Sequence, residues 1–587
     1  MKSLRRVIGN SVISLLGQMV TWTSTLLLTI AYGRFLGGQL LGELYFAITF
    51  VALIGFPIEF GFNSQLTRDV AQEPARALRY LTNTIFLKVL LWVILYGVLL
   101  YLCQRLGYDA EQQKLVAICG ITLLCTAITN AFGSLHYAFE RAVFPVVGNI
   151  IEKSVGALAG IWLLSQGASV EVMALVLLGS AFANTLWQGA WFIKLMGVHL
   201  SLDGKLMLQL TRTGLPFLLY GVLGVIYYRL DTVLLSLMTN AQVVGWYGAG
   251  YRIFDTLVFL PSLIVGTVMY PVFSRLSVTS EATLKLAAEK SLNFLLVCVA
   301  PITTMLVVGA TSVIGFFYHR PEFAHSIRVL EALGPGLFFL YVNTVFTTIL
   351  ISVKQEKKIT MMAAVALVFN LGMNLLLIPL YRQVGSAMVT TLTEFLLLCM
   401  AIPITPRRLL PTGSISVAAK TGVAAIAMAL VIRVMKNLSL IYILPVAVLV
   451  YLLLATLLGA IPREDIQALI HAVRKKSQPA AAEGEPVHTD VEPALPSVEP
   501  AHTGVEPAPD KEVPWFVSAV PVEPTPRKKE AAHTDAGPSP AEGEPALAGN
   551  IPWFVTAVQV EPAADPPARS LSRGQQRQRQ RHQPPPA

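Results

Sequence analysis

Several ionisable side chains lie inside, or at the end of, long apolar stretches of this sequence, where a charge is costly. On the insertion scale, one charge at the centre of a membrane-spanning helix costs about 2.5–3.5 kcal/mol, so such residues tend to face a cavity or a partner. Arginine binds phosphate oxygens through two parallel hydrogen bonds, and lysine binds them as a compact charge. The candidates for binding an anionic cargo are Arg229, Arg252, Lys153, Lys88 and Arg34, and those for coupling to an ion are Glu394, Asp231 and Asp255.

Two of these stretches carry one cation and one carboxylate each. Arg229 and Asp231 share the first, and Arg252 and Asp255 share the next. Arg252 and Asp255 are three residues apart, which places them on one helical face and allows them to pair. Two interpretations stay open: the four residues form a buried salt-bridge network between two helices, or Arg229 and Arg252 face a cavity and contact cargo.

The remaining candidates have alternatives of their own. Lys153 follows Glu152 directly. Because adjacent residues point about 100° apart on a helix, we expect that these two do not face one site. Lys153 and Lys88 either line the cavity or serve as partnered structural charges, and Lys88 has the further option of snorkelling to the interface. Arg34 is a cavity residue or an interfacial anchor. Glu394 is a proton-coupling site or a hydrogen-bonded packing residue.

Fourteen apolar stretches, each long enough to cross a bilayer, position these residues. A helix needs roughly 20 apolar residues to span the hydrocarbon, and its backbone must be satisfied internally. With 54% hydrophobic and 13% charged residues, the chain is expected to be an all-α polytopic membrane protein. The stretches are Val12–Tyr32, Leu44–Phe62, Leu81–Cys103, Leu115–Leu135, Pro145–Leu164, Val172–Ile193, Leu215–Met238, Tyr247–Tyr270, Leu292–Phe317, Leu333–Val353, Thr360–Leu380, Ser386–Ile404, Val417–Met435 and Ile441–Ile461.

This map divides the chain into five parts. Residues 1–200 hold the first six spans, and residues 201–405 hold the next six. Residues 406–462 add two more spans, and residues 463–478 are a short amphipathic segment predicted to lie at the inner membrane face. Residues 479–587 are rich in Pro, Ala and Glu without apolar periodicity, so we expect a disordered tail.

The loop charges predict the orientation. Loops on the side of the N-terminus carry 23 Lys and Arg residues, against 8 on the other side. Positive loops stay in the cytoplasm, and an even number of spans returns the chain to the same side. Both termini are therefore expected to be cytoplasmic, in a multi-pass protein of the plasma membrane. The first stretch is too long for a signal peptide and lacks a cleavage site.

The tail contains one element twice. The run Pro514–Val517 reads Pro-Trp-Phe-Val and is repeated at Pro552–Val555, each time followed by Ala-Val and Val-Glu-Pro. One interpretation is a duplicated low-complexity segment without a partner. The other is a pair of docking motifs for a cytoplasmic protein, in which two tethered copies give avidity. The aromatic residues that would dock are Trp515, Phe516, Trp553 and Phe554.

The sequence lacks the motifs that several classes of protein require. The chain has no G-x-x-x-x-G-K-[ST] motif for ATP, no H-E-x-x-H and no Cys/His cluster with metal-ligand spacing. All five cysteines lie in apolar stretches, as small buried hydrophobes do. The short loops leave no room for a soluble catalytic domain. We therefore expect no enzyme activity, metal, cofactor or nucleic-acid partner, with a membrane glycosyltransferase or polymerase as the enzymatic alternative.

A short internal repeat indicates paired helix bundles. Gln39–Gly42 precedes the second span, and Gln242–Gly245 precedes the eighth, 203 residues later. Six spans thus repeat as six spans in the same orientation. Transporters are often built from such paired bundles, with the substrate path between them. We therefore expect two six-helix lobes around a central cavity, plus two C-terminal helices.

Several short motifs of this sequence form a recognisable set. They are Gly33-Arg34-Phe35-Leu36-Gly37, Glu59-Phe60-Gly61-Phe62, Leu215-Pro216-Phe217, Tyr228-Arg229-Leu230-Asp231-Thr232, Gly245-Trp246-Tyr247-Gly248-Ala249-Gly250-Tyr251-Arg252, Pro271-Val272-Phe273-Ser274-Arg275-Leu276 and Gly385-Ser386-Ala387. With these motifs the sequence resembles the polysaccharide-biosynthesis flippases (O-antigen or Wzx-type) of the multidrug/oligosaccharidyl-lipid/polysaccharide exporter superfamily, over about residues 5–405. The stretch Leu215–Leu276 is the most specific part.

The resemblance implies a function. It implies two six-helix lobes in a V shape, and the flipping of an undecaprenyl-diphosphate-linked oligosaccharide from the cytoplasmic to the outer leaflet, with membrane lipids as surroundings. Many such flippases stop at twelve spans. Fourteen spans are similar to the lipid II flippases, in which the extra pair forms a groove for the lipid tail, but their Arg-rich first-span pattern is missing. A lipid II flippase-like transporter and a multidrug/cation exporter therefore stay open as alternatives.

Overall fold

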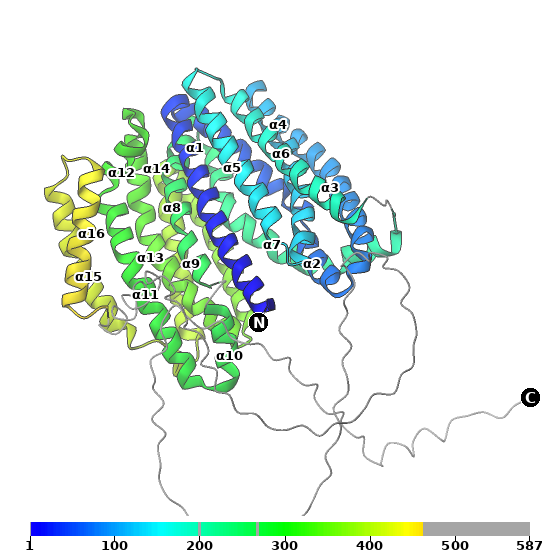
Figure 1. Cartoon of the computed structure of the whole chain (residues 1–587). Coiled ribbons are helices and arrows are strands. Elements are labelled where there is room, and N and C mark those ends of the chain that lie inside the picture. Colours follow the sequence, from blue (N-terminus) through cyan, green and yellow to red (C-terminus); the bar gives the residue numbers. More distant parts are fainter. Residues whose placement is uncertain (1, 198–200, 266–268, 462–587) are drawn as a thin grey trace, which may run out of the picture. The chain divides into compact units, whose positions relative to one another are not determined.

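The computed structural model describes residues 2–197, 201–265 and 269–461, and this part of the chain is helical without a strand (Figure 1). The all-helical, multi-pass class predicted from the sequence is confirmed. The amphipathic segment 463–478 and the tail 479–587, with its two Pro-Trp-Phe-Val copies, lie outside the described residues. The first helix group comprises α1 (Lys2–Gly55), α2 (Phe62–Gln72), α3 (Ala77–Arg105), α4 (Ala110–Ala138), α5 (Val143–Ser165) and α6 (Val170–Met196).

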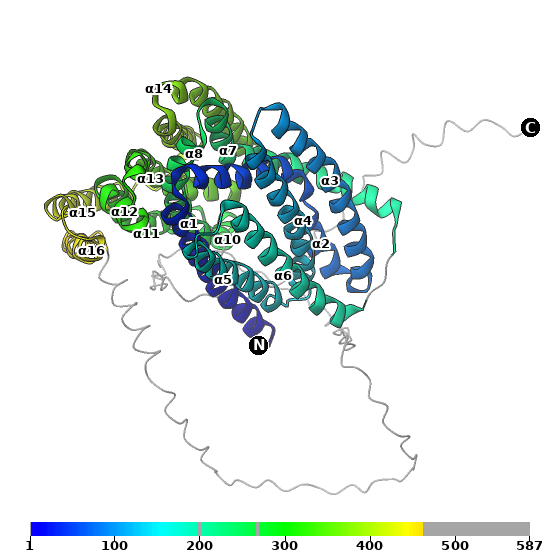
Figure 2. The ribbon, with the colours of Figure 1, turned by 90° about the horizontal axis from the view of Figure 1, so that it is seen from above.

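The second helix group follows after residue 203. It comprises α7 (Gly204–Met238), α8 (Ala241–Leu257), α9 (Phe259–Ile264), α10 (Tyr270–Thr279), α11 (Glu281–Val308), α12 (Ala310–Tyr318), α13 (Ala324–Ser352) and α14 (Glu356–Ile404). The chain continues with α15 (Ser414–Val434) and α16 (Leu440–Leu457), which pack on each other and, through α15, on α11. Both views show this pair beside α11 and α12 (Figure 2).

Ten helical segments of the described residues are long and apolar enough to cross a membrane, so the count of fourteen is not confirmed. Two of the ten cover two predicted stretches each. At 1.5 Å per residue, α1 and α14 would be about 80 and 70 Å long if straight, against a hydrocarbon core of about 30 Å. Each is broken at one non-helical residue, at Gly37 with φ 82° and at Arg382 with φ 51°. The predicted stretch Tyr247–Tyr270 is divided among α8, α9 and α10.

Side-chain caps begin several helices where loops end. Asp109 accepts a hydrogen bond from the Gln112 amide at the start of α4. Asp203 caps α7 in the same way, as its carboxylate accepts from the Lys205 and Leu206 amides. Such caps satisfy amides that have no partner within the helix. Arg79 of α3 also donates to Asp203, and this contact holds the pKa of the carboxyl below its usual value. The capped loop is therefore tied to α3 at neutral pH.

The two helix groups meet where α1 crosses α8, because both helices have glycine at the contact. A Cβ atom on Gly42 would lie 1.8 Å from the Ala241 carbonyl oxygen, and one on Gly245 would lie 1.8 Å from the Gly38 carbonyl oxygen. Residues 38 and 241 are separated by the same 203 positions as residues 42 and 245. The two contacts are thus the same contact with the partners exchanged. The residues of the sequence repeat pack directly against each other.

Candidate substrate site

Asp231 is the centre of a buried polar cluster between α7 and α8. It is 4% exposed, and its carboxylate accepts a hydrogen bond from the Tyr247 hydroxyl. It also accepts from the amide of Thr232 at 2.7 Å and from the hydroxyl of the same residue at 3.4 Å. Neutral donors therefore supply the three hydrogen bonds that this carboxylate accepts. The predicted network of four charges does not include an Arg229–Asp231 ion pair within 4 Å among the described residues.

Arg229 lies next to this cluster and is half-buried. Its guanidinium is close enough to Tyr45, Tyr251, Asp255 and Asp231 to interact electrostatically with them. Within the described part of the chain, it makes no ion pair or hydrogen bond that would use its donors. A guanidinium in this position keeps its fork of donors available for a ligand.

Arg252 and Asp255 form the pair that their spacing predicts. The Arg252 Nη1 atom lies 3.4 Å from the Asp255 Oδ2 atom, and the two side chains are 24% and 38% exposed. The Nε atom of Arg252 is buried and has no hydrogen-bond partner among the described residues. This pair is reachable by solvent, and the arginine retains an unused donor.

Lys88 is a fully partnered structural charge. Its side chain is 0% exposed. The ammonium donates to Glu59 Oε2 at 2.8 Å, to Asn63 Oδ1 at 3.0 Å and to the Ala127 carbonyl at 3.0 Å. Asn130 donates to the other Glu59 oxygen at 2.9 Å. An ammonium has three protons, and all are used here, so Lys88 neither snorkels nor offers a donor to a cargo.

The expectation that Glu152 and Lys153 point away from each other is wrong. Its ammonium lies 2.6 Å from the Oε1 atom of the adjacent Glu152, although adjacent Cα–Cβ bonds diverge. Two long side chains bridge that divergence. The other Glu152 oxygen accepts from Asn184 of α6 at 2.7 Å, and the same amide donates to Asn149 at 3.1 Å. The polar row thus links α5 to α6.

Lys153 is 45% exposed and lies on the face of α5 that also carries its buried glycines. Asn149, Lys153, Gly156 and Gly160 follow one another at helical spacing, and both glycines are buried. Leu158 is 71% exposed. At 3.6 residues per turn, this leucine points about 140° away from Lys153 around the helix. The exposed residues Asn149 and Lys153 therefore lie on the face of α5 opposite to Leu158, in line with the two buried glycines.

Glu394 of α14 is the buried carboxylate of the second helix group. It is 5% exposed, and it accepts from the Tyr227 hydroxyl of α7 at 2.9 Å and from the Asn343 amide of α13 at 2.9 Å. No cation lies within 4 Å of it among the described residues. The sequence did not indicate Tyr227 or Asn343, since neutral hydrogen-bond donors in apolar helices leave no spacing pattern.

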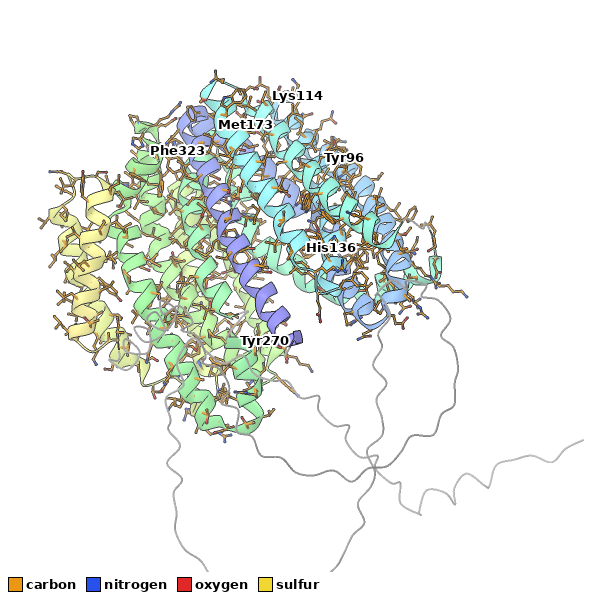
Figure 3. The ribbon with its side chains drawn as sticks, viewed as in Figure 1. Tyr96, Lys114, His136, Met173, Tyr270 and Phe323 are labelled. Atoms are coloured by element: carbon orange, nitrogen blue, oxygen red, sulfur yellow. The ribbon has the colours of Figure 1, made fainter. Side chains whose placement is uncertain are left out.

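Arg34 lies at the end of the bundle and reaches the second helix group. Its guanidinium donates to the carbonyl oxygens of Phe316 and Phe317, in the last turn of α12. It is exposed, and its donors are engaged by backbone carbonyls and not by an acidic side chain. Figure 3 shows the side chains, with Phe323 and Lys114 near this end and Tyr270 near the other.

The structure does not bring all candidates together. Arg229, Asp231, Arg252 and Asp255 form one cluster, whereas Lys153, Lys88, Glu394 and Arg34 each lie in separate polar groups. A surface pocket of about 860 Å³ is lined by Arg79 and residues 201–205 and contains none of these residues. The docking candidates Trp515, Phe516, Trp553 and Phe554 lie outside the described residues.

Comparison with known proteins confirms the family resemblance. Residues 7–277 match the family model described as "Polysaccharide biosynthesis protein". The probable low-salt glycan biosynthesis flippase Agl15 of Haloferax volcanii is 22% identical over 371 residues, which cover 62% of this chain and 75% of the relative. An uncharacterized membrane protein of Methanocaldococcus jannaschii, MJ1068, is 25% identical over 169 residues, which cover 29% of this chain and 33% of that protein.

Solved structures show the same fold. The lipid II flippase MurJ in an inward closed conformation matches with a TM-score of 0.61 at 15% identity, over 78% of this chain and 99% of that chain. A multidrug resistance MATE family transporter of the MOP superfamily in an inward-facing conformation matches with a TM-score of 0.56 at 14% identity, over 69% and 99%. The chain is a multi-pass membrane protein with the fold of these transporters, and one of its sequence relatives is a probable flippase.

Proposed function

We propose that this chain is a flippase that moves an undecaprenyl-diphosphate-linked oligosaccharide from the inner to the outer leaflet by alternating access, without covalent chemistry. The observation that carries the proposal is the presence of available cationic donors within apolar helices. Arg229 has no hydrogen-bond or ion-pair partner among the described residues, and the Lys153 ammonium, paired with Glu152, is 45% exposed. The match of residues 7–277 to polysaccharide biosynthesis proteins supports the class of cargo.

The charge balance favours an anionic cargo over a cationic drug. Asp231 and Glu394 are buried and already accept hydrogen bonds from neutral donors, so both carboxylates are less accessible to a cationic drug than exposed carboxylates would be. Arg229 retains unused donors, and the neighbouring Arg252 side chain is 24% exposed. A diphosphate bound by such donors would recover part of the hydration it loses on entering the membrane.

The test measures leaflet exchange of a diphosphate-polyprenyl oligosaccharide by the full chain in liposomes. We expect Arg229→Ala, Arg252→Ala and Lys153→Ala each to slow exchange by about tenfold or more, since a hydrogen bond to a charged group contributes about 1.5–3 kcal/mol. The matched control is Lys290→Ala, which removes an exposed cation of α11. Wild-type rates in all three variants would reject the site. Slower exchange of a cationic drug instead would favour the exporter.

We further propose that Glu394 couples transport to protons, with Asp231 and Asp255 as the remaining candidates. Burial among neutral neighbours makes the charged form of a carboxylate costly. The carboxylate therefore releases its proton more readily in a conformation that exposes it to water, and this links its protonation to conformation. We expect Glu394→Gln, which keeps the size and most hydrogen bonds, to exchange lipid at a rate that no longer responds to an imposed pH gradient. The wild-type response to the gradient in this variant would refute the assignment.

The docking of Trp515, Phe516, Trp553 and Phe554 to a cytoplasmic protein stays a prediction from the repeated tail motif. The lipid II flippase-like alternative differs only in the cargo, so the same liposome measurement with lipid II separates it from the oligosaccharide flippase.

A further inference from the structure

Two arginines at one end of the bundle hold each other's backbone. Arg34, near the break of α1, donates to the carbonyls of Phe316 and Phe317, the former at 2.6 Å. Arg320, just beyond α12, donates from Nε to the Arg34 carbonyl at 2.8 Å and from Nη2 to the Phe35 carbonyl at 2.9 Å. Each guanidinium thus donates hydrogen bonds to two successive backbone carbonyls, and these carbonyls belong to the segment that carries the other arginine.

The acceptors are carbonyls at the ends of two helices. The last carbonyls of a helix have no partner within it and carry a partial negative charge, so a cation there is stabilising. A guanidinium fork suits two neighbouring oxygens, and hydrogen bonds from a charged donor are stronger than neutral ones. Separating the two segments would therefore leave both helix ends uncapped and both arginines without these acceptors.

Neighbouring contacts fit tightly around this arrangement. Gly37 has a φ of 82°, and a Cβ atom there would lie 2.8 Å from the Arg320 Nη1 atom. Glycine is favoured at such positive φ values. The Gly38 amide donates to Glu322 at 3.2 Å. Tyr318 of α12 packs its fully buried ring against Gly33 and donates to the Ala249 carbonyl at 3.0 Å. The segment is therefore shaped for this closed contact.

We propose that Arg34 and Arg320 form a reciprocal clasp that keeps this end of the two helix groups closed and that must open for cargo to leave. The loop charges assign this end to the outer side of the membrane. The inference deepens the alternating-access function proposed above and rests on it. It assigns to Arg34 a role between the helix groups instead of a role in cargo binding.

The test measures distances between pairs of spin labels by double electron–electron resonance. It uses the full chain with its five native cysteines replaced. One label pair, at Lys114→Cys and Glu331→Cys, reports the clasp end, and the other, at Arg76→Cys and Lys358→Cys, reports the opposite end. All four native side chains are exposed. No cargo is needed, so the outcome does not depend on whether the proposed substrate is right.

We expect Arg320→Ala to lengthen the first distance and shorten the second, with the ratio of open to closed molecules at the clasp end rising about tenfold. Arg320→Lys keeps the charge but not the fork, and we expect an intermediate ratio. Arg328→Ala, which removes an exposed cation of α13 near the same end, should leave both distances unchanged.

Two results would overturn the proposal. One is wild-type distances at both ends in Arg34→Ala and Arg320→Ala. The other is a broadened distance at the clasp end alone, because local fraying does not couple to the opposite end.

Discussion

Gly245→Ala is expected to separate α1 from α8 and to reduce lipid exchange by more than about tenfold. The added Cβ atom would lie 1.8 Å from the Gly38 carbonyl oxygen, and this obstacle is backbone, which cannot rotate away as a side chain can. Overpacking of this kind costs about 1–3 kcal/mol and occasionally more. The measurements are the thermal midpoint of the purified protein in detergent and the exchange rate in liposomes.

The chain offers two controls for this result. Gly42→Ala would place its Cβ 1.8 Å from the Ala241 carbonyl oxygen, so we expect it to be as damaging as Gly245→Ala. Gly97→Ala in α3 would meet no atom within 4 Å. An alanine inside a helix is more stable than glycine by about 0.5–1 kcal/mol. A midpoint for Gly245→Ala that equals that of Gly97→Ala would contradict the close crossing.

Lys88→Met is expected to destabilise the first helix group by up to about 3–5 kcal/mol, the cost of removing one partner from a fully buried ion pair; the 26% exposure of Glu59 reduces the cost. The Glu59 carboxylate would lose its cation, and Asn63 and the Ala127 carbonyl would lose a donor. We expect a large fall in the yield of folded protein and in its thermal midpoint. Lys358→Met, at an exposed lysine of α14, is the matched control.

A double variant separates structure from transport. Lys88→Met with Glu59→Gln removes both charges, and we expect it to recover much of the stability, because the uncompensated carboxylate is then gone. If Lys88 instead contacted cargo, Lys88→Met alone would slow exchange while the thermal midpoint stayed at its wild-type value. That combination would refute the structural role.

The sequence could indicate charged residues inside apolar stretches, because the free energy of placing a charge in a membrane is high whatever the tertiary structure. Charges in apolar stretches made Arg229, Lys153 and Glu394 candidates, and they stay predictions. The three-residue spacing predicted the Arg252–Asp255 pair, which the structure confirms. The repeated Gln-x-x-Gly element indicated paired bundles, although its packing of Gly42 against the Ala241 carbonyl could not be foreseen.

The sequence could not indicate contacts whose partner has no recognisable sequence pattern. Arg34 and Arg320 bind backbone carbonyls, which every residue possesses, so no spacing identifies their acceptors. Lys88 and Glu59 are brought together only by tertiary packing. The rule that adjacent helical residues diverge treats side chains as short vectors. It failed at Lys153 because the lysine and glutamate are long enough to bend toward each other.

The Lys88–Glu59 pair has a consequence for biogenesis. Glu59 precedes α3 in the sequence, so during synthesis the carboxylate leaves the ribosome before the lysine does. A lone lysine at mid-helix costs about 2.5–3.5 kcal/mol at the translocon, and a waiting counter-charge lowers that barrier. We therefore expect α3 to insert poorly into the membrane in a truncated nascent chain that lacks the residues before 77. Insertion of α3 would then depend on its contact with the segment that carries Glu59.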